Sequence, residues 1–247
     1  MTEHSKSRRQ VIRWIGVVSG GAIFADRGCL RAENRPKEQV NAKGIAEEVS
    51  PNEDLMRDHG LLNRLLLIYE EAARRLDVGA DLDPAALSRA AGVIRHFIED
   101  YHEKLEEDHM FPRFERAGKL VELVAVLRTQ HQAGRRLTTE IQRLANLKTL
   151  KKPSERRTLG NFLRMFSGMY RPHEAWEDTV LFPAFRGVVS GHEYAALGEE
   201  FEDQEHKLFG EDGFEKNVAQ VAALEKEFGI YDLERFTPRW LRFTPAS

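Results

Sequence analysis

Two short stretches of this sequence carry the residues best suited to chemistry, and the two resemble each other. Residues 102–112 read HEKLEEDHMFP, and residues 173–183 read HEAWEDTVLFP. Each stretch begins with a histidine and has a glutamate four residues later, namely His102 with Glu106 and His173 with Glu177. On a helix, residues four apart lie one above the other on the same face. Each stretch is therefore expected to present one imidazole beside one carboxylate.

The surroundings of these pairs indicate that they are buried. Both stretches contain further apolar residues and end in Phe-Pro, at Pro112 and Pro183. A buried carboxylate beside a buried imidazole is costly unless a partner compensates it. A metal ion would satisfy both groups, so we interpret the two stretches as parts of a metal site.

A single histidine precedes each stretch at a matched distance. His59 lies 72 residues before His131, and His102 lies 71 residues before His173. The complete set of candidate ligands is therefore His59, His102, Glu106, His131, His173 and Glu177. Four imidazoles and two carboxylates suit a pair of metal ions, with two histidines on each ion and both glutamates bridging. Nitrogen and oxygen ligands without a thiolate favour iron or manganese over structural zinc.

Helices must position these side chains. Apolar residues recur at three- and four-residue spacing, which predicts four long helices over about residues 51–76, 84–117, 120–147 and 154–183. Ser50-Pro51, with Glu53 three positions after the serine, is typical of a helix start. Two matched helical hairpins predict an all-α fold, an antiparallel up-down four-helix bundle over residues 50–185. Residues 186–247 are expected to add shorter C-terminal helices, near 192–209 and 215–228, that pack on the bundle.

Composition excludes several other classes of protein. The chain has 247 residues and a formal net charge of −3, without long blocks of one sign, so nothing predicts a nucleic-acid partner. Its single cysteine, Cys29, lies in the N-terminal segment, which excludes an internal disulfide and cysteine-based zinc or iron–sulfur sites in the body. No run of 18 apolar residues is present, so we expect no ordinary transmembrane helix.

The first 32 residues are interpreted as a twin-arginine signal segment. Residues 7–13 read SRRQVIR, with the paired Arg8 and Arg9, and a short, weakly apolar run follows to Ala25. The segment predicts export to the periplasm or beyond; the alternative is a cytoplasmic protein with an irregular tail. Residues 33–49 are charged and irregular, and are interpreted as a linker.

Taken together, residues 50–185 resemble the hemerythrin-like, His-His-Glu cation-binding family. The resemblance implies that the family's non-heme di-iron ligands fall on the six residues named above. Oxygen-carrying members place two histidines four apart on the third helix, whereas here Arg135 follows His131 at that spacing. The set is similar instead to the branch linked to nitrosative stress, iron–sulfur cluster repair and iron sensing, although the cysteine-bearing N-terminal domain usual in the repair branch is not found in this sequence.

The resemblance leaves two classes of function open. The first is a module that binds or senses dioxygen, nitric oxide or iron. The second is a di-iron oxidoreductase acting on peroxide or nitric oxide, or an iron donor for cluster repair. We favour the first, because no acid–base pair can be recognised in the sequence.

The remaining polar residues allow more than one interpretation. Glu103 and Glu174 either orient the ligands or lie on the surface. Tyr101 and Tyr170 either line the site or only pack. His109, His192 and His206 are expected on the surface.

Overall fold

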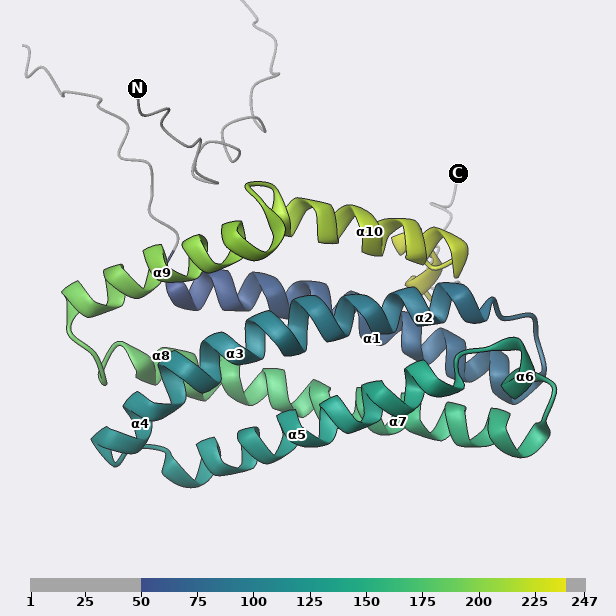
Figure 1. The fold of residues 1–247 in the computed structure, drawn as a ribbon, viewed down its shortest axis with the longest axis horizontal. Coiled ribbons are helices and arrows are strands. Elements are labelled where there is room, and N and C mark those ends of the chain that lie inside the picture. Colours follow the sequence, from purple (N-terminus) through teal and green to yellow (C-terminus); the bar gives the residue numbers. More distant parts are fainter. Residues whose placement is uncertain (1–49, 239–247) are drawn as a thin grey trace, which may run out of the picture. The chain divides into compact units, whose positions relative to one another are not determined.

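The computed structural model describes residues 50–238, and all the regular elements among them are helices (Figure 1). The expected all-α fold is thus confirmed for this range. The predicted signal segment (1–32) and linker (33–49) lie outside the described residues. No described helix has the length and apolar character needed to cross a membrane.

The first helical hairpin runs from residue 51 to residue 117. Helix α1 (Pro51–Val78) begins with a capping box, in which the Ser50 side chain accepts from the Glu53 N–H and the Glu53 carboxylate accepts from the Ser50 N–H. Gly79 ends α1 with a positive φ of 69°. The returning rod is α2 (Pro84–Val93), a π-helical stretch (Ile94–His102), α3 (Glu103–Leu105), a second π-helical turn (Glu106–Met110) and α4 (Phe111–Ala117).

The second hairpin repeats this plan. Helix α5 (Val121–Leu144) is followed by the short α6 (Leu147–Leu150) and then by α7 (Pro153–Trp176), a π-helical turn (Glu177–Leu181) and α8 (Phe182–Phe185). The last rod continues two residues beyond the predicted end at Pro183. In both hairpins the His-x-x-x-Glu pair lies where α-helical and π-helical turns meet. Such π-helical turns are frequent at functional sites.

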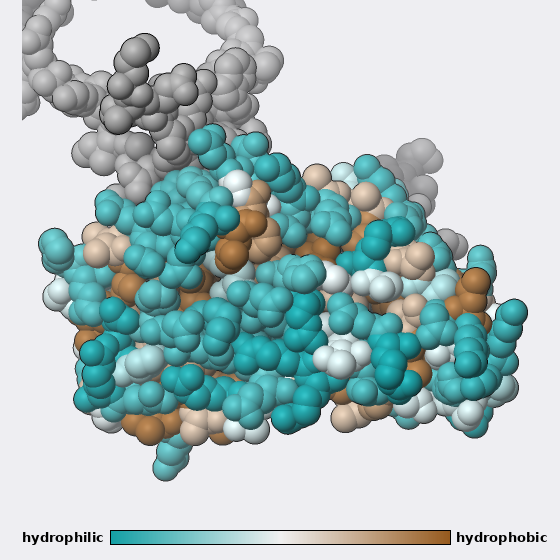
Figure 2. All heavy atoms as spheres, viewed as in Figure 1, coloured by the Kyte–Doolittle hydropathy of each residue, from teal (hydrophilic) through white to brown (hydrophobic). Residues whose placement is uncertain are grey.

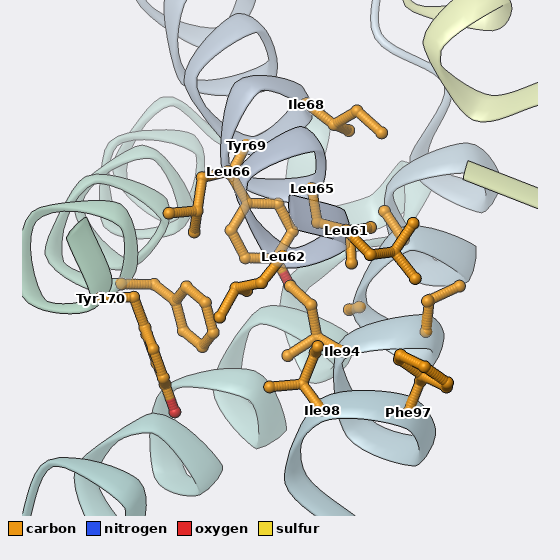
Figure 3. Packing of buried hydrophobic residues seen from close by; sticks show 14 of the residues in the cluster. Leu61, Leu62, Leu65, Leu66, Ile68, Tyr69, Ile94, Phe97, Ile98 and Tyr170 are labelled. Carbon is orange, nitrogen blue, oxygen red and sulfur yellow. The ribbon is translucent and has the colours of Figure 1, made fainter. Parts of the chain in front are cut away.

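Each of the four long rods packs against two neighbours. Helix α1 lies against α7, α7 against α5, α5 against the α2–α4 rod, and that rod against α1. The space between them is filled by leucine, isoleucine and aromatic side chains, many of them fully buried. Figure 3 shows part of this core, where Leu62, Leu66 and Tyr69 of α1 face Ile94 and Ile98 of the second rod and Tyr170 of α7. These apolar contacts hold the rods at fixed distances around the buried polar residues.

Two further helices correspond to those predicted after the bundle. They are α9 (Gly191–Phe209) and α10 (Gly213–Glu227), and a short 3₁₀ turn follows at Leu233–Phe236. Both pack against α1, and α10 also contacts α2. In Figure 1 they run along one side of the bundle, and α5 and α7 form the opposite side. The surface turned toward the viewer is mostly hydrophilic, with small hydrophobic patches (Figure 2).

Candidate metal centre

The six predicted ligands lie together in the interior, and their side chains are between 0% and 4% exposed. They come from all four rods, one histidine each from α1 and α5 and one His-x-x-x-Glu pair from each returning rod. The histidines form two pairs. Nε2 of His59 is 3.1 Å from Nε2 of His102, and Nε2 of His131 is 3.2 Å from Nε2 of His173.

These nitrogen–nitrogen distances suit two imidazoles that share one cation. Two nitrogens bound at about 2.1 Å, at an angle between square and tetrahedral, would be about 3.0–3.4 Å apart. A hydrogen bond between two neutral imidazoles would also bring the two nitrogens this close. In such a bond one Nε2 donates and the other accepts, so only one nitrogen lone pair in each pair of histidines gains a partner. Two such pairs with their Nε2 atoms turned toward one another in the core therefore favour cations over an internal hydrogen-bond network.

The two carboxylates lie between the histidine pairs. Oε1 of Glu106 is 3.8 Å from Nε2 of His102, and its Oε2 is 3.5 Å from Nε2 of His131. Oε2 of Glu177 is 3.1 Å from Nε2 of His173 and 3.4 Å from Nε2 of His59. Each carboxylate thus reaches one histidine of each pair. This is the placement that a carboxylate bridging two ions requires.

All four oxygens of Glu106 and Glu177 are buried without a hydrogen-bond partner. Buried carboxylate oxygens are rarely left in this state, because each unsatisfied oxygen costs free energy. Burial, together with the nearby charge of Glu177, raises the pKa of Glu106 well above its usual range. A shared cation would remove both penalties, so the donor set fits a metal ion on this structural ground as well as on its chemistry.

A second layer of side chains holds the four imidazoles. The Nδ1 atom of each histidine contacts one oxygen: His59 contacts Asp178 at 2.8 Å, His102 contacts Asp58 at 3.2 Å, His131 contacts Glu107 at 3.1 Å and His173 contacts Gln130 at 2.8 Å. An acceptor at Nδ1 fixes the tautomer in which Nε2 carries the lone pair. Burial lowers the pKa of His131 to about 4, so this imidazole is neutral at pH 7 and can act as a ligand.

Sequence reasoning missed these four partners, although a signal was present. Each is the immediate neighbour of a predicted ligand. Asp58 precedes His59 and Gln130 precedes His131, while Glu107 follows Glu106 and Asp178 follows Glu177. The second layer therefore obeys the same repeat as the ligands. Its one chemical difference is that Gln130 stands where the first half has Asp58.

Arg135 is not a ligand but supports one. Its guanidinium lies 2.8 Å from Glu107 and 2.8 Å from Glu103, and Glu107 in turn accepts from His131. The acidic residues Glu103 and Glu107 also form a group with His131 that has metal-like spacing. Arg135 already supplies the positive charge between these two carboxylates, so this third group needs no metal ion.

Glu103 and Glu174 are both buried, so the surface alternative for them is wrong. The Tyr170 hydroxyl donates to Glu103 at 2.5 Å, and the amide of Asn63 donates to Glu174. Burial raises the pKa of Glu103 well above its usual range and that of Glu174 to about 8. Both glutamates therefore belong to the polar shell around the candidate ligands.

Tyr170 borders the site, whereas Tyr101 packs away from it. The ring of Tyr170 lies 5.3 Å from that of His173, between centroids, and stacks on Phe166 at 4.4 Å. Its hydroxyl occupies the space above Gly134 of α5, where any Cβ atom would overlap it. The ring of Tyr101 instead meets Phe209 of α9 at 5.5 Å.

The three histidines expected on the surface differ from one another. His192 is exposed, as predicted, but His109 and His206 are half-buried, so for these two the expectation was wrong in degree. His109 lies under α9, with its ring 5.5 Å from that of Phe201 and its Nε2 3.0 Å from the Gln204 amide. The prediction missed this burial because it depends on how the C-terminal helices pack.

Comparison with known proteins agrees with this arrangement. A family model described as "Hemerythrin HHE cation binding domain" matches residues 50–164. The match covers α1 to the middle of α7 and ends before His173 and Glu177. Relatives from Mycobacterium bovis (Mb2018) and Mycobacterium tuberculosis (Rv1995), both described as uncharacterized proteins, are 46% identical over 208 residues, which cover 84% of this chain and 79% of theirs. No solved structure matches.

Proposed function

Because the chain belongs to the hemerythrin HHE cation-binding domain family, we propose that it is a non-heme di-iron protein that binds or senses a small ligand such as dioxygen or nitric oxide. The observation that carries this proposal is the position of Glu106 and Glu177, each between one histidine of each pair. A single ion held by one histidine pair and both glutamates would leave the other histidine pair unused.

In the proposed site, the chain's own residues would hold the ions. His59 and His102 would hold one iron, His131 and His173 the other, and the two glutamates would bridge them. Bound iron would supply the redox and ligand-binding chemistry; manganese has similar ligand preferences and is the alternative metal. The surrounding shell keeps Nε2 of each histidine available and limits access of water to the centre.

The fold we propose for the whole site is the antiparallel up-down four-helix bundle. Two features support it: each rod packs against two neighbours, and the two halves repeat at spacings of 71 and 72 residues. In that bundle the two halves would be related by a pseudo-twofold axis.

Arg135 bears on whether the protein could carry oxygen reversibly. It occupies the position where oxygen carriers of the family have a further histidine, and its guanidinium is engaged by Glu103 and Glu107. A guanidinium stays protonated and offers no lone pair, so it cannot become a metal ligand. We therefore infer that the chain reacts with or senses its ligand, and does not carry oxygen reversibly.

The test begins with metal content. Protein expressed with iron supplied should contain about two iron ions per chain. Glu106→Gln should lose much of this iron, and the control Glu140→Gln, at a partly exposed position of α5 away from the candidate ligands, should retain it. An iron-free parent protein would overturn the proposal.

Stopped-flow spectroscopy then separates the functional classes. The reduced, iron-loaded protein is mixed with dioxygen, nitric oxide or hydrogen peroxide. A spectral change complete within one equivalent supports a binding or sensing module. Continued consumption of peroxide or nitric oxide would instead assign the chain to the oxidoreductases.

We also propose that the chain is exported by the twin-arginine route. The support comes from residues 7–13 and the weakly apolar run that follows them. This route carries folded proteins, which suits a domain that acquires its metal before it crosses the membrane.

A further inference from the structure

A cavity of about 220 Å³ opens between α5 and α7, beside the candidate centre. Its lining includes Leu123, Val126, Leu127, Gln130, His173 and Trp176. No acid, lysine or arginine is among the lining residues. The cavity is thus mainly apolar, with one neutral amide and one imidazole at its inner side.

The inner side of the cavity is the second layer of the site. Gln130 accepts from Nδ1 of His173 at 2.8 Å, and both residues line the cavity. Leu127 beside them is buried, whereas Val126 and Trp176 are 52% and 55% exposed. The cavity therefore leads from the surface to the histidine pair formed by His131 and His173.

The internal repeat shows what the same face is like in the other half. The first-half equivalent of each lining residue lies 72 positions earlier in the sequence for residues of α5 and 71 positions earlier for residues of α7. These equivalents are Pro51, Asp54, Leu55, Asp58, His102 and Leu105. Every one of these equivalents is buried. The repeat thus contains two equivalent faces, of which one is closed and one is open.

The C-terminal helices account for this difference. Helices α9 and α10 pack against α1, and on that side Phe209 contacts Tyr101 while the Arg57 guanidinium lies over the Phe214 ring at 4.2 Å. Among the described residues, no helix covers the face between α5 and α7 in this way. Within residues 50–238, therefore, the face between α5 and α7 is open and its equivalent in the first half is covered.

We propose that the α5–α7 cavity is the port through which a small uncharged molecule of the dioxygen or nitric oxide class reaches the centre, on the side of His131 and His173. This inference rests on the proposed function. An apolar passage of this size admits small neutral molecules and disfavours ions, which would lose their hydration without gaining a partner. The neutral Gln130 keeps charge out of the passage, and the acidic counterpart, Asp58, lies on the closed side.

The first test probes the cavity itself, with xenon as a gas-sized apolar probe. Apolar cavities in proteins take up xenon. Methyl NMR spectra of the purified full chain under xenon pressure should show shifts at Leu123, Val126 and Leu127. Val126→Trp, which adds bulk at the mouth, should abolish them. Val121→Trp is the matched control, since Val121 is another exposed valine of α5 (44%) outside the lining.

The second test measures passage to the centre. In the iron-loaded, reduced protein, Val126→Trp should leave the metal content unchanged and slow the reaction with nitric oxide by roughly tenfold, as expected when access is gated. Val121→Trp should react at the parent rate. Equal rates in the two variants, or no xenon shift at the three residues, would overturn the port.

Two further outcomes are distinguishable. If sedimentation shows a dimer in the parent that Val126→Trp dissociates, the cavity is an interface between copies of the chain, and the port is overturned. A chain that takes up no metal overturns the proposed function and the port together. If the protein binds its full metal content but Val126→Trp and Val121→Trp react at equal rates, the port is overturned and the proposed function is not.

Discussion

The amide oxygen of Gln130 lies 2.8 Å from Nδ1 of His173, at the position where the first half of the chain places a carboxylate. There, Asp58 lies 3.2 Å from Nδ1 of His102. A carboxylate makes the imidazole it contacts a stronger donor to a metal than a neutral amide does. The two halves of the centre are therefore chemically unequal, although their ligands match.

This inequality predicts two different affinities. The His59–His102 position should bind the first ion more tightly, and Asp58→Asn should weaken it by about 10- to 100-fold. Gln130→Glu should strengthen binding at the other position and bring the two steps closer together. Calorimetric titration of the metal-free protein with Mn²⁺ or Fe²⁺ under argon measures both steps. Two indistinguishable binding steps in the parent, unchanged in both variants, would contradict the prediction.

The contact between Gly134 and Tyr170 predicts a destabilising substitution. Gly134→Ala would place a Cβ atom in the Tyr170 hydroxyl, so we expect a loss of about 1–3 kcal/mol in the free energy of unfolding, as for other overpacked cores. Gly168→Ala is the control, because a Cβ at this position of α7 meets nothing within 4 Å. It should stabilise the protein by up to about 1 kcal/mol through helix propensity. Urea unfolding measures both.

A double-mutant cycle tests the cause of that loss. Tyr170→Phe removes the hydroxyl, so the combined Gly134→Ala/Tyr170→Phe protein should be more stable than the sum of the two single effects allows. Strictly additive losses would show that the hydroxyl is not the atom in conflict.

Glu71 predicts a pH dependence of stability remote from the centre. Hydrogen bonds from Arg74 and then Arg75 lower the pKa of this carboxyl to about 2. A folded-state pKa below the unfolded value of 4.5 means that the stabilisation is complete above about pH 5 and is lost as the pH falls toward 2. Because Arg74 is half exposed, solvent screening limits the contribution of Glu71 to about 1 kcal/mol or less.

The measurement compares Glu71→Gln with the parent at several pH values. The difference in free energy of unfolding should be largest near neutral pH and shrink below pH 4.5. Glu70→Gln, at an exposed neighbour paired with Arg171, should change stability little at any pH. A difference for Glu71→Gln that does not vary with pH would show that its charge is not the cause.

If residues 1–32 are the twin-arginine signal segment that we predict, changing the arginine pair should block export. Replacing Arg8 and Arg9 together with lysine should leave the full-length protein inside the cell, because the twin-arginine route reads this pair. Arg13→Lys keeps a basic residue at the last position of the motif and serves as the control. Cell fractionation with an antibody to the chain gives the result. If the double substitution fractionates as the parent does, residues 1–32 do not act as an export signal.

The sequence alone was sufficient for the local features of this protein. The helices were predictable because caps such as Ser50–Glu53 and apolar spacing are encoded within a few residues. Four of the six candidate ligands were recognisable because His-x-x-x-Glu places both groups on one helix face and occurs twice. The other two, His59 and His131, were recognisable because they precede the two copies at a matched spacing.

The tertiary structure decided which ordinary acidic and amide residues take part. Glu107, Asp178 and Gln130 look like solvated helix residues in the sequence, and they contact imidazoles 24, 119 and 43 positions away. Three further features could not be read from the sequence. They are the ion pairs of Arg135, the space that Gly134 leaves for Tyr170, and the covering of one face of the bundle by α9 and α10. Whether a charged side chain is buried, and by what it is satisfied, depends on helices that meet only after folding, because burial and hydrogen bonding are set by packing and not by local spacing.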